Sequence, residues 1–73
     1  MTLNYRGVVY RKNTEVRFII PTDHRIVDPQ TKNILWRRGS LEFFSKDKLS
    51  CYIKENGTKK NIRISLFCVL PLN

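Results

Sequence analysis

The last third of the chain alternates apolar and other side chains in the way typical of β-strands. From Ile62 to Leu70, apolar residues stand at every second position, and Leu49 to Ile53 repeats the pattern upstream. Between the two segments lies Asn56-Gly57. This pair is preferred in type I′ turns, because both central positions of such a turn need φ > 0. We therefore predict an antiparallel hairpin that turns at Asn56-Gly57.

A two-residue loop at Asn56-Gly57 would also fix the register of this hairpin. Cys51 would face Ile62, and the apolar residues of both strands would share one face of the sheet. Cys68 would then lie about 20 Å from Cys51 at ~3.3 Å per residue. A disulfide needs Cα atoms within ~7 Å of each other, so we expect both cysteines to be reduced core residues.

Further turn signals divide the rest of the chain into short strands. Asp28-Pro29 would begin a turn that joins residues 25–27 to residues 34–37. Lys12-Asn13 would join an N-terminal strand to residues 16–20. Residues 41–44 are predicted as a strand followed by a turn at 45–48, with a short helix capped by Ser40 as the alternative.

The whole chain, residues 1–73, is short enough to make one domain with a thin core. The predicted fold is all-β, with five to seven short antiparallel strands built as consecutive hairpins. A small antiparallel barrel of SH3-like size, or a strongly curved sheet, would leave the fewest unpaired strand edges.

The opening stretch, residues 4–13, reads as one continuous strand with Gly7 in its middle. A glycine inside a strand marks a bulge, a tight coil or the close approach of another backbone. Alternation would place Tyr5 and Val9 on one face and Arg6 and Tyr10 on the other. We therefore predict a coiled first strand that presents Arg6 outward.

A motif overlaps this stretch, in which Leu3, Tyr5, Arg6, Gly7, Val8 and Tyr10 form Leu-x-Tyr-Arg-Gly-Val-x-Tyr. It resembles the opening of a family of short, mainly cyanobacterial proteins of unknown function, some of which repeat the Tyr-Arg-Gly element. Residues 36–39, Trp-Arg-Arg-Gly, are a loose echo of that repeat. The resemblance implies a bacterial, cytoplasmic protein and supplies no activity.

The chain is strongly basic. Its 14 Lys and Arg residues and six acidic residues give a formal net charge of +8. Such an excess favours polyanions or acidic protein surfaces as partners, through long-range attraction and counterion release. The plainer interpretation is that the charge keeps a small β domain soluble. No run of basic residues is longer than two, so the charge is spread along the chain.

The N-terminal residues do not have the continuous apolar core of a secretory signal, because four basic residues interrupt the first twenty. The apolar run from Leu66 to Leu70 is far shorter than a membrane span. We expect a soluble, cytoplasmic monomer or weak homodimer with no membrane partner.

Catalysis has little support in the sequence. Asp23-His24 is the one acid–base neighbourhood, and no nucleophile can be assigned to it. Residues typical of a phosphate loop or a metal site do not occur at the required spacings. We predict a protein that is not an enzyme, with no cofactor, no metal and no small-molecule substrate.

The positive hypothesis is a small basic binding module for single-stranded DNA or RNA. Such modules combine cationic side chains for phosphates with aromatic rings for base stacking. Tyr52 is the best stacking candidate, because it projects away from the core side of its hairpin. The aromatic residues could equally cover the second face of a thin sheet. The candidate binding residues are Arg6, Trp36, Arg37, Arg38, Tyr52, Lys54 and Arg63.

Two features of this set stay open at the level of sequence. Only one of Trp36 and Arg37 can point inward, and Gly39 is predicted as a turn or bulge after their strand. The alternative function is an adaptor or regulator that docks on an acidic protein surface or a larger complex. It would use an exposed apolar patch rimmed by basic residues, formed by Phe43, Phe44, Phe67 and residues 70–72.

Overall fold

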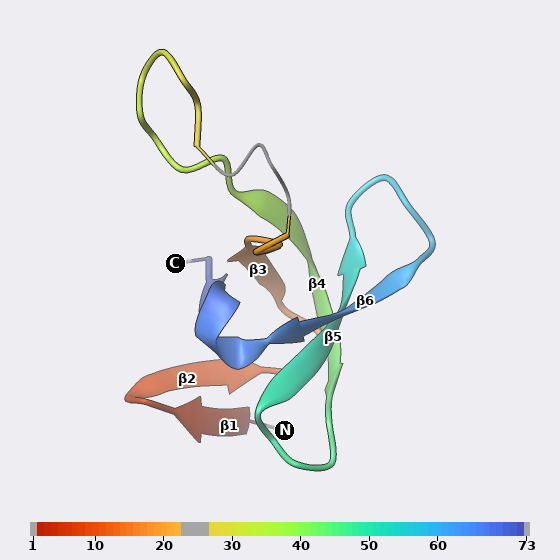
Figure 1. Ribbon diagram of the computed structural model, residues 1–73. Helices are drawn as coiled ribbons and strands as arrows, with labels where there is room; N and C mark the ends of the chain where they lie inside the picture. Colours follow the sequence, from red (N-terminus) through yellow and green to blue (C-terminus); the bar gives the residue numbers. More distant parts are fainter. Residues whose placement is uncertain (1, 23–26, 73) are drawn as a thin grey trace.

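The computed structural model describes residues 2–22 and 27–72 of the chain (Figure 1). The all-β prediction is confirmed. The seven strands are β1 (Thr2–Tyr5), β2 (Val8–Arg11), β3 (Glu15–Phe18), β4 (Arg37–Phe44), β5 (Ser50–Glu55), β6 (Asn61–Ser65) and β7 (Val69–Pro71). A single 3₁₀ turn, η1 (Leu66–Cys68), separates β6 from β7 in the described part of the chain.

The strands form two antiparallel sheets. One is the two-stranded hairpin β1-β2, and the other has five strands in the order β6-β5-β4-β3-β7. Consecutive strands from β3 to β6 are neighbours, whereas β7 crosses over to pair with β3. Between the described strands the two sheets are not joined by a ladder, so they do not close into a barrel.

The core lies on one side of the five-stranded sheet, which we call the inner face. The β1-β2 hairpin and η1 pack against it (Figure 1). Tyr10 fixes the hairpin in place, because its buried hydroxyl donates to the carbonyls of Val69, at 2.7 Å, and Leu66, at 3.2 Å. The buried apolar residues are Tyr10, Val16, Phe18, Leu41, Cys51, Ile53, Ile64, Leu66 and Val69.

The prediction of one coiled N-terminal strand is wrong. Arg6 (φ 54°) and Gly7 (φ 82°) both have positive φ, which is the requirement of a type I′ turn, and the chain reverses there. Asn4 supports the turn by accepting a hydrogen bond from the Gly7 amide through Oδ1. Because the strand reverses, Tyr5 and Val8 are direct partners on one face.

The predicted hairpin between the N-terminal strand and residues 16–20 is also wrong. β2 pairs with β1, and β3 pairs with β4 and β7. The intervening turn carries the chain from one sheet to the other. Asn13 (φ 65°) anchors this turn by donating its amide to the carbonyl of Leu41, and Thr14 Oγ1 donates to the carbonyl of Arg11.

The β5-β6 hairpin exists, but its register differs from the prediction by two residues. Cys51 pairs with Ile64 instead of Ile62. The cause is the loop, in which Gly57 has positive φ (84°) and Asn56 does not, so the two-residue type I′ turn is not formed. A slip of two positions preserves the side-chain faces, because the strand period is two. Cys51 and Cys68 are both free.

The middle of the chain is only partly as predicted. Val27 and Ile34 form an isolated antiparallel bridge around a turn in which Lys32 has a positive φ of 64°. Residues 25 and 26 of the predicted strand lie outside the described residues. The strand at 41–44 and the turn at 45–48 are confirmed, although the strand begins earlier, at Arg37.

Gly39 was expected in a turn or bulge, but it is buried in the middle of β4. A Cβ atom placed there would lie 2.5 Å from the backbone oxygen of Lys54 and 2.6 Å from Ile53 Cγ2. The glycine therefore allows β4 and β5 to approach closely beside the core.

Candidate nucleic-acid interface

The side of the five-stranded sheet that faces away from the core carries most of the candidate binding residues. We call it the outer face. Strand alternation and the observed pairing place its members opposite one another across β3, β4, β5 and β6. Its cationic and aromatic residues are Arg17, Arg38, Phe43, Tyr52, Lys54 and Arg63.

A β-bulge decides which phenylalanine joins this face. The pairing of β4 with β5 shifts between Leu41 and Phe43, so Glu42 is an extra residue on β4. Leu41 therefore remains buried, Phe43 turns outward and is 44% exposed, and Phe44 packs against the core. Uninterrupted alternation would have placed Phe43 on the same face as Leu41.

Phe43 and Tyr52 form an aromatic pair at the centre of the candidate interface. They are direct cross-strand partners, and their ring centroids lie 4.8 Å apart at an interplanar angle of 33°. Such a pair is stable in itself and keeps both rings at one place on the sheet. Phe43 is more exposed than the half-buried Tyr52, so its ring is the more accessible to a further planar group.

Arg63 lies directly beside this pair, as the cross-strand partner of Tyr52 on β6. Its Nη2 is 3.8 Å from Asp47 Oδ2, and its Nε donates to Ser50 Oγ at 3.4 Å. The pKa of Asp47 is lowered, first by the hydrogen bond from the Ser45 hydroxyl and then by the Leu49 amide. Asp47 is therefore a carboxylate at neutral pH and partly neutralises Arg63.

A second cationic and aromatic group lies on β3 and at the start of β4. The guanidinium of Arg17 stacks over the ring of Trp36, 4.8 Å from its centroid. Arg17 and Arg38 are direct cross-strand partners, and like charges in this position repel each other. The Arg17 Nε is buried and has no hydrogen-bond partner. An anion bound here would relieve both the repulsion and the unsatisfied donor.

Two of the predicted binding residues lie elsewhere. Arg37 is on the inner face, where its Nε and Nη2 donate to the two carboxylate oxygens of Glu55 on β5. It is therefore held in a bidentate ion pair. Arg6 lies at the β1-β2 turn, where its guanidinium is 5.1 Å from the ring centroid of Phe67. These two arginines do not join the outer face.

The remaining predicted residues come together on one side of the sheet. Arg38, Tyr52, Lys54 and Arg63 share the outer face, and Trp36 reaches it through its contact with Arg17. Sequence reasoning missed Arg17 and Phe43. Alternation with the apolar residues of β3 could have found Arg17, whereas only knowledge of the bulge could have found Phe43.

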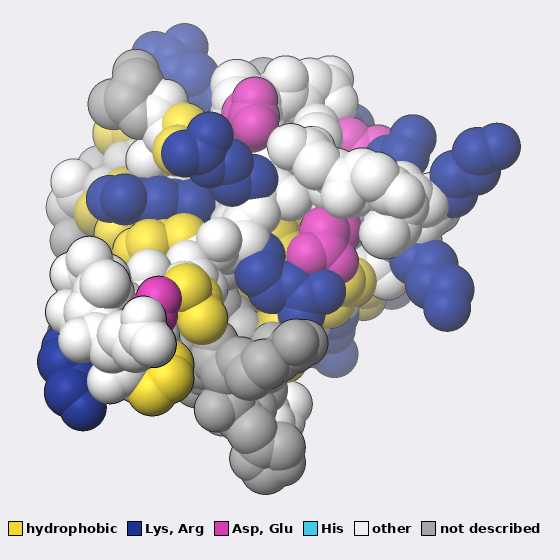
Figure 2. All heavy atoms as spheres, turned by 90° about the horizontal axis from the view of Figure 1, so that it is seen from above, with side chains coloured by type: hydrophobic (Ala, Val, Ile, Leu, Met, Phe, Trp, Pro, Cys, Tyr) yellow, Lys and Arg dark blue, Asp and Glu magenta, His cyan; other side chains and the backbone are white. Residues whose placement is uncertain are grey.

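Two carboxylates besides Asp47 interrupt the basic character of this region. Glu42 accepts from Ser40 Oγ at 3.1 Å, and Glu15 accepts from Asn56 Nδ2 at 3.2 Å. With Asp47, three carboxylates stand against the four cations of the outer face, so the excess of positive charge there is small. In Figure 2, Lys and Arg side chains are likewise spread over the visible surface with hydrophobic and acidic side chains between them.

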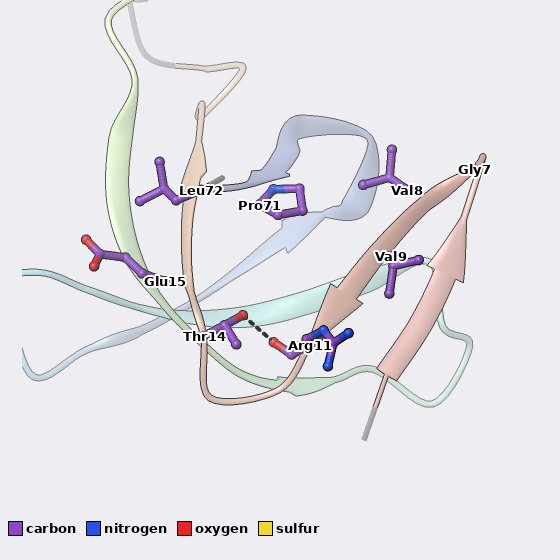
Figure 3. A pocket seen from close by; sticks show the side chains of 8 residues that line it. All are labelled: Gly7, Val8, Val9, Arg11, Thr14, Glu15, Pro71 and Leu72. Carbon is purple, nitrogen blue, oxygen red and sulfur yellow. Dashed lines mark hydrogen bonds between the residues drawn. The ribbon is translucent and has the colours of Figure 1, made fainter.

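Hollows occur beside the sheets in the described part of the chain, and two of them reach the ~300 Å³ typical of the smallest ligand sites. The larger is a groove of about 690 Å³ between the β1-β2 hairpin and the edge formed by β3 and β7 (Figure 3). It is lined by Gly7, Val8, Val9, Arg11, Thr14, Glu15, Pro71 and Leu72. The smaller is a cleft of about 300 Å³ where β1 begins beside the β4-β5 turn, lined by Thr2, Leu3, Lys12, Phe43, Phe44, Ser45, Lys46 and Lys48.

The thiol of Cys51 is buried in the core. Burial raises the pKa of the Cys51 thiol to about 12, so this group is protonated and inert at neutral pH. In the part of the chain that the structure describes, no three His, Cys, Asp or Glu side chains are grouped so that they could hold a metal ion. Asp23 and His24 lie outside the described residues.

Comparisons with known proteins identified no relative of this chain. No protein family, no curated protein and no solved structure matches this chain. The likeness of residues 3–10 to the cyanobacterial motif therefore stays a prediction. Among the described residues, no helix has the length and apolar character needed to cross a membrane.

Proposed function

We propose that this protein is a non-catalytic binding module for single-stranded nucleic acid, and that the strand lies across the outer face of the five-stranded sheet. The observation that carries the proposal is the Phe43–Tyr52 ring pair with Arg63 directly beside it. Stacking on aromatic rings and contacts to phosphates are the two elements of sequence-tolerant single-strand binding.

The roles follow from position on the sheet. Phe43, which is the more exposed ring, would stack a base, and Tyr52 would support it from behind. Lys54 and Arg63 flank the pair on β5 and β6 and would contact the phosphates on either side. The Arg17–Arg38 pair lies on β3 and β4, about 13–17 Å from the ring pair at ~3.3 Å per residue, because Arg38 is five residues before Phe43 on β4. It would hold a phosphate further along the bound strand.

A titration of ¹⁵N-labelled protein with short oligothymidylate and oligouridylate, at low and at physiological salt, tests the proposal. We expect the largest amide shifts on β4 and β5 around Phe43, Tyr52 and Lys54, and we expect them to persist at about 0.15 M salt. Weak shifts spread over the whole surface that disappear with salt would mean that the +8 charge attracts polyanions without a defined site.

A matched control uses a pairing of an exposed aromatic ring with an arginine on another part of the surface. Phe67 is 69% exposed and contacts Arg6, so it repeats the local chemistry away from the outer face. Phe67→Leu is expected to leave oligonucleotide binding unchanged, whereas Phe43→Leu is expected to weaken it by about 5- to 150-fold, the range for one stacked base.

The second candidate function is docking of a protein segment, and the groove of Figure 3 favours it. The predicted single apolar patch is not formed, because Phe44 packs inward and residues 70 and 71 pair with β3. The groove instead places the half-exposed Val9, on the unpaired edge of β2, opposite Pro71 and Leu72. An extended segment could add to that edge.

Val9→Lys separates the two candidates. Val9 is 48% exposed, so the substitution is expected to leave the fold intact while it places a charge in the groove. Oligonucleotide binding on the outer face should not change. If Val9→Lys lost oligonucleotide binding and the outer-face variants did not, the oligonucleotide would bind in the groove and not on the outer face.

A further inference from the structure

The smaller cleft, at the end of the sheet, combines an apolar floor with a basic rim. Leu3, Phe43 and Phe44 supply its apolar surface. Lys12, from the β2-β3 turn, and Lys46 and Lys48, from the β4-β5 turn, line the same space. Lys12 is far in sequence from Lys46 and Lys48, and the packing of the hairpin against the sheet brings the two turns around one hollow.

The charge of this cleft is not balanced by its own lining, because none of the described residues that line it is acidic. Asp47 lies between two of the lysines in sequence but is engaged elsewhere. Its Oδ1 accepts from Ser45 Oγ, at 2.5 Å, and from the Leu49 amide, at 3.0 Å, and its Oδ2 is 3.8 Å from Arg63. The cleft therefore suits an anion attached to an apolar, planar group.

The backbone of the turn supports this assignment. Lys48 has φ 60°, a left-handed conformation that costs a lysine about 1 kcal/mol and that Gly, Asn or Asp would adopt more easily. Lys48 nevertheless lines the cleft beside Lys46. Residues held in such conformations cluster at functional sites.

Phe43 belongs both to the cleft and to the ring pair of the outer face. A strand that stacks on this pair would thus reach the cleft without leaving the sheet. We infer that the cleft receives the terminal nucleotide of the bound strand, with its base against Leu3, Phe43 and Phe44 and its terminal phosphate among Lys12, Lys46 and Lys48. This inference rests on the proposed function and adds to it a preference for phosphorylated ends.

The chemistry selects a nucleoside monophosphate over either of its parts. Phosphate alone would meet three exposed ammonium groups, which hold an anion weakly in water. A nucleoside alone would gain only the apolar floor. The cleft volume of about 300 Å³ is at the lower end for small-molecule sites and fits one nucleotide unit better than a longer segment.

The test compares oligothymidylates that carry a terminal phosphate at the 5′ end, at the 3′ end or at neither end, by fluorescence anisotropy at about 0.15 M salt. One of the phosphorylated forms is expected to bind about fivefold more tightly than the unphosphorylated one, as for a contact of about 1 kcal/mol. Thymidine monophosphate is expected to shift the amides of residues 43–48, and thymidine or inorganic phosphate to shift them less.

The double variant Lys12→Gln, Lys46→Gln should remove the preference for phosphorylated ends. The matched control is Lys59→Gln, Lys60→Gln, which makes the same change of charge in the exposed β5-β6 loop and should keep the preference. Equal affinities for all three oligonucleotides, or equal effects of the two double variants, would overturn the inference and leave outer-face binding standing. Failure of every oligonucleotide to bind would instead overturn the proposed function, and the inference with it.

Discussion

The two faces of the five-stranded sheet are made by the same strands and differ in almost every respect. On the inner face, Val16, Phe18, Leu41 and Ile53 are fully buried. On the outer face, arginines are direct partners across β3 and β4 without a carboxylate between them. Residues next to each other in sequence thus serve different purposes. The inner face supplies the stability that lets the outer face carry repelling charges and exposed rings.

The largest effect is expected on the inner face. Leu41→Ala removes a fully buried side chain from the centre of the core and should lower the free energy of unfolding by about 2–5 kcal/mol. A domain of this size has only ~4–11 kcal/mol in total, so the substitution should remove a large share of its stability. Urea denaturation followed by circular dichroism measures this. A loss below about 1 kcal/mol would show that the core is not where we place it.

Gly39→Ala should be the next most severe change. The added methyl group would lie 2.5 Å from the Lys54 backbone oxygen, and the two strands must separate to admit it. We expect Gly39→Ala to lower the free energy of unfolding by about 1–3 kcal/mol. Gly57→Ala is the matched control, because it meets open space and is disfavoured only by its φ of 84°, at a cost of about 1 kcal/mol. An equal loss in both variants would contradict the close approach of β4 and β5.

Tyr10→Phe tests how the hairpin is held to the inner face. The Val69 carbonyl would lose its hydroxyl donor, whereas the Leu66 carbonyl would keep the Val69 amide as a donor. We therefore expect the free energy of unfolding to fall by about 1–3 kcal/mol at neutral pH. Burial raises the pKa of Tyr10, so the stability it contributes is complete below pH 10 and is lost as the pH rises through the folded-state pKa. The difference in free energy of unfolding between wild type and Tyr10→Phe should therefore become smaller above pH 10. A constant difference would exclude a buried, hydrogen-bonded phenol.

The smallest effect is expected from single charges on the outer face. Lys54→Gln should leave stability within about 0.5 kcal/mol of wild type. It should also reduce the slope of log affinity against log salt by about 0.7, the value for one phosphate contact with a single strand. The same substitution at Lys59, in the exposed β5-β6 loop, should not change the slope. If wild type and Lys54→Gln had the same slope of log affinity against log salt, Lys54 would not contact the bound strand.

The comparison of faces also shows how much of the fold the sequence predicts. The alternation of apolar residues is enough to identify which residues of β5 and β6 face the core. A register shift of two residues leaves each side chain on the same face of the sheet. The register itself depends on the loop, where Asn56 does not take the φ > 0 that its type favours. The N-terminal turn was missed for the opposite reason, since Arg6 takes a positive φ that arginine rarely adopts.

The candidate site is less predictable than the fold. Arg37 and Arg38 are equivalent in sequence, and only the position of Glu55 across the sheet makes the first an ion-pair partner and leaves the second on the outer face. Phe43 lies on the outer face because of a β-bulge, and no residue pattern in the sequence predicts that bulge. The cleft lysines come from two separate turns, and only tertiary packing brings them together.

The most direct test of the division between the faces is one pair of measurements on three proteins: wild type, Tyr52→Leu and Phe67→Leu. Oligothymidylate affinity is measured by anisotropy at about 0.15 M salt, and unfolding is measured in urea. We predict that Tyr52→Leu weakens binding at least about fivefold while stability changes by less than about 1 kcal/mol, and that Phe67→Leu changes neither. Equal weakening by both variants, or none by Tyr52→Leu, would contradict an interface on the outer face.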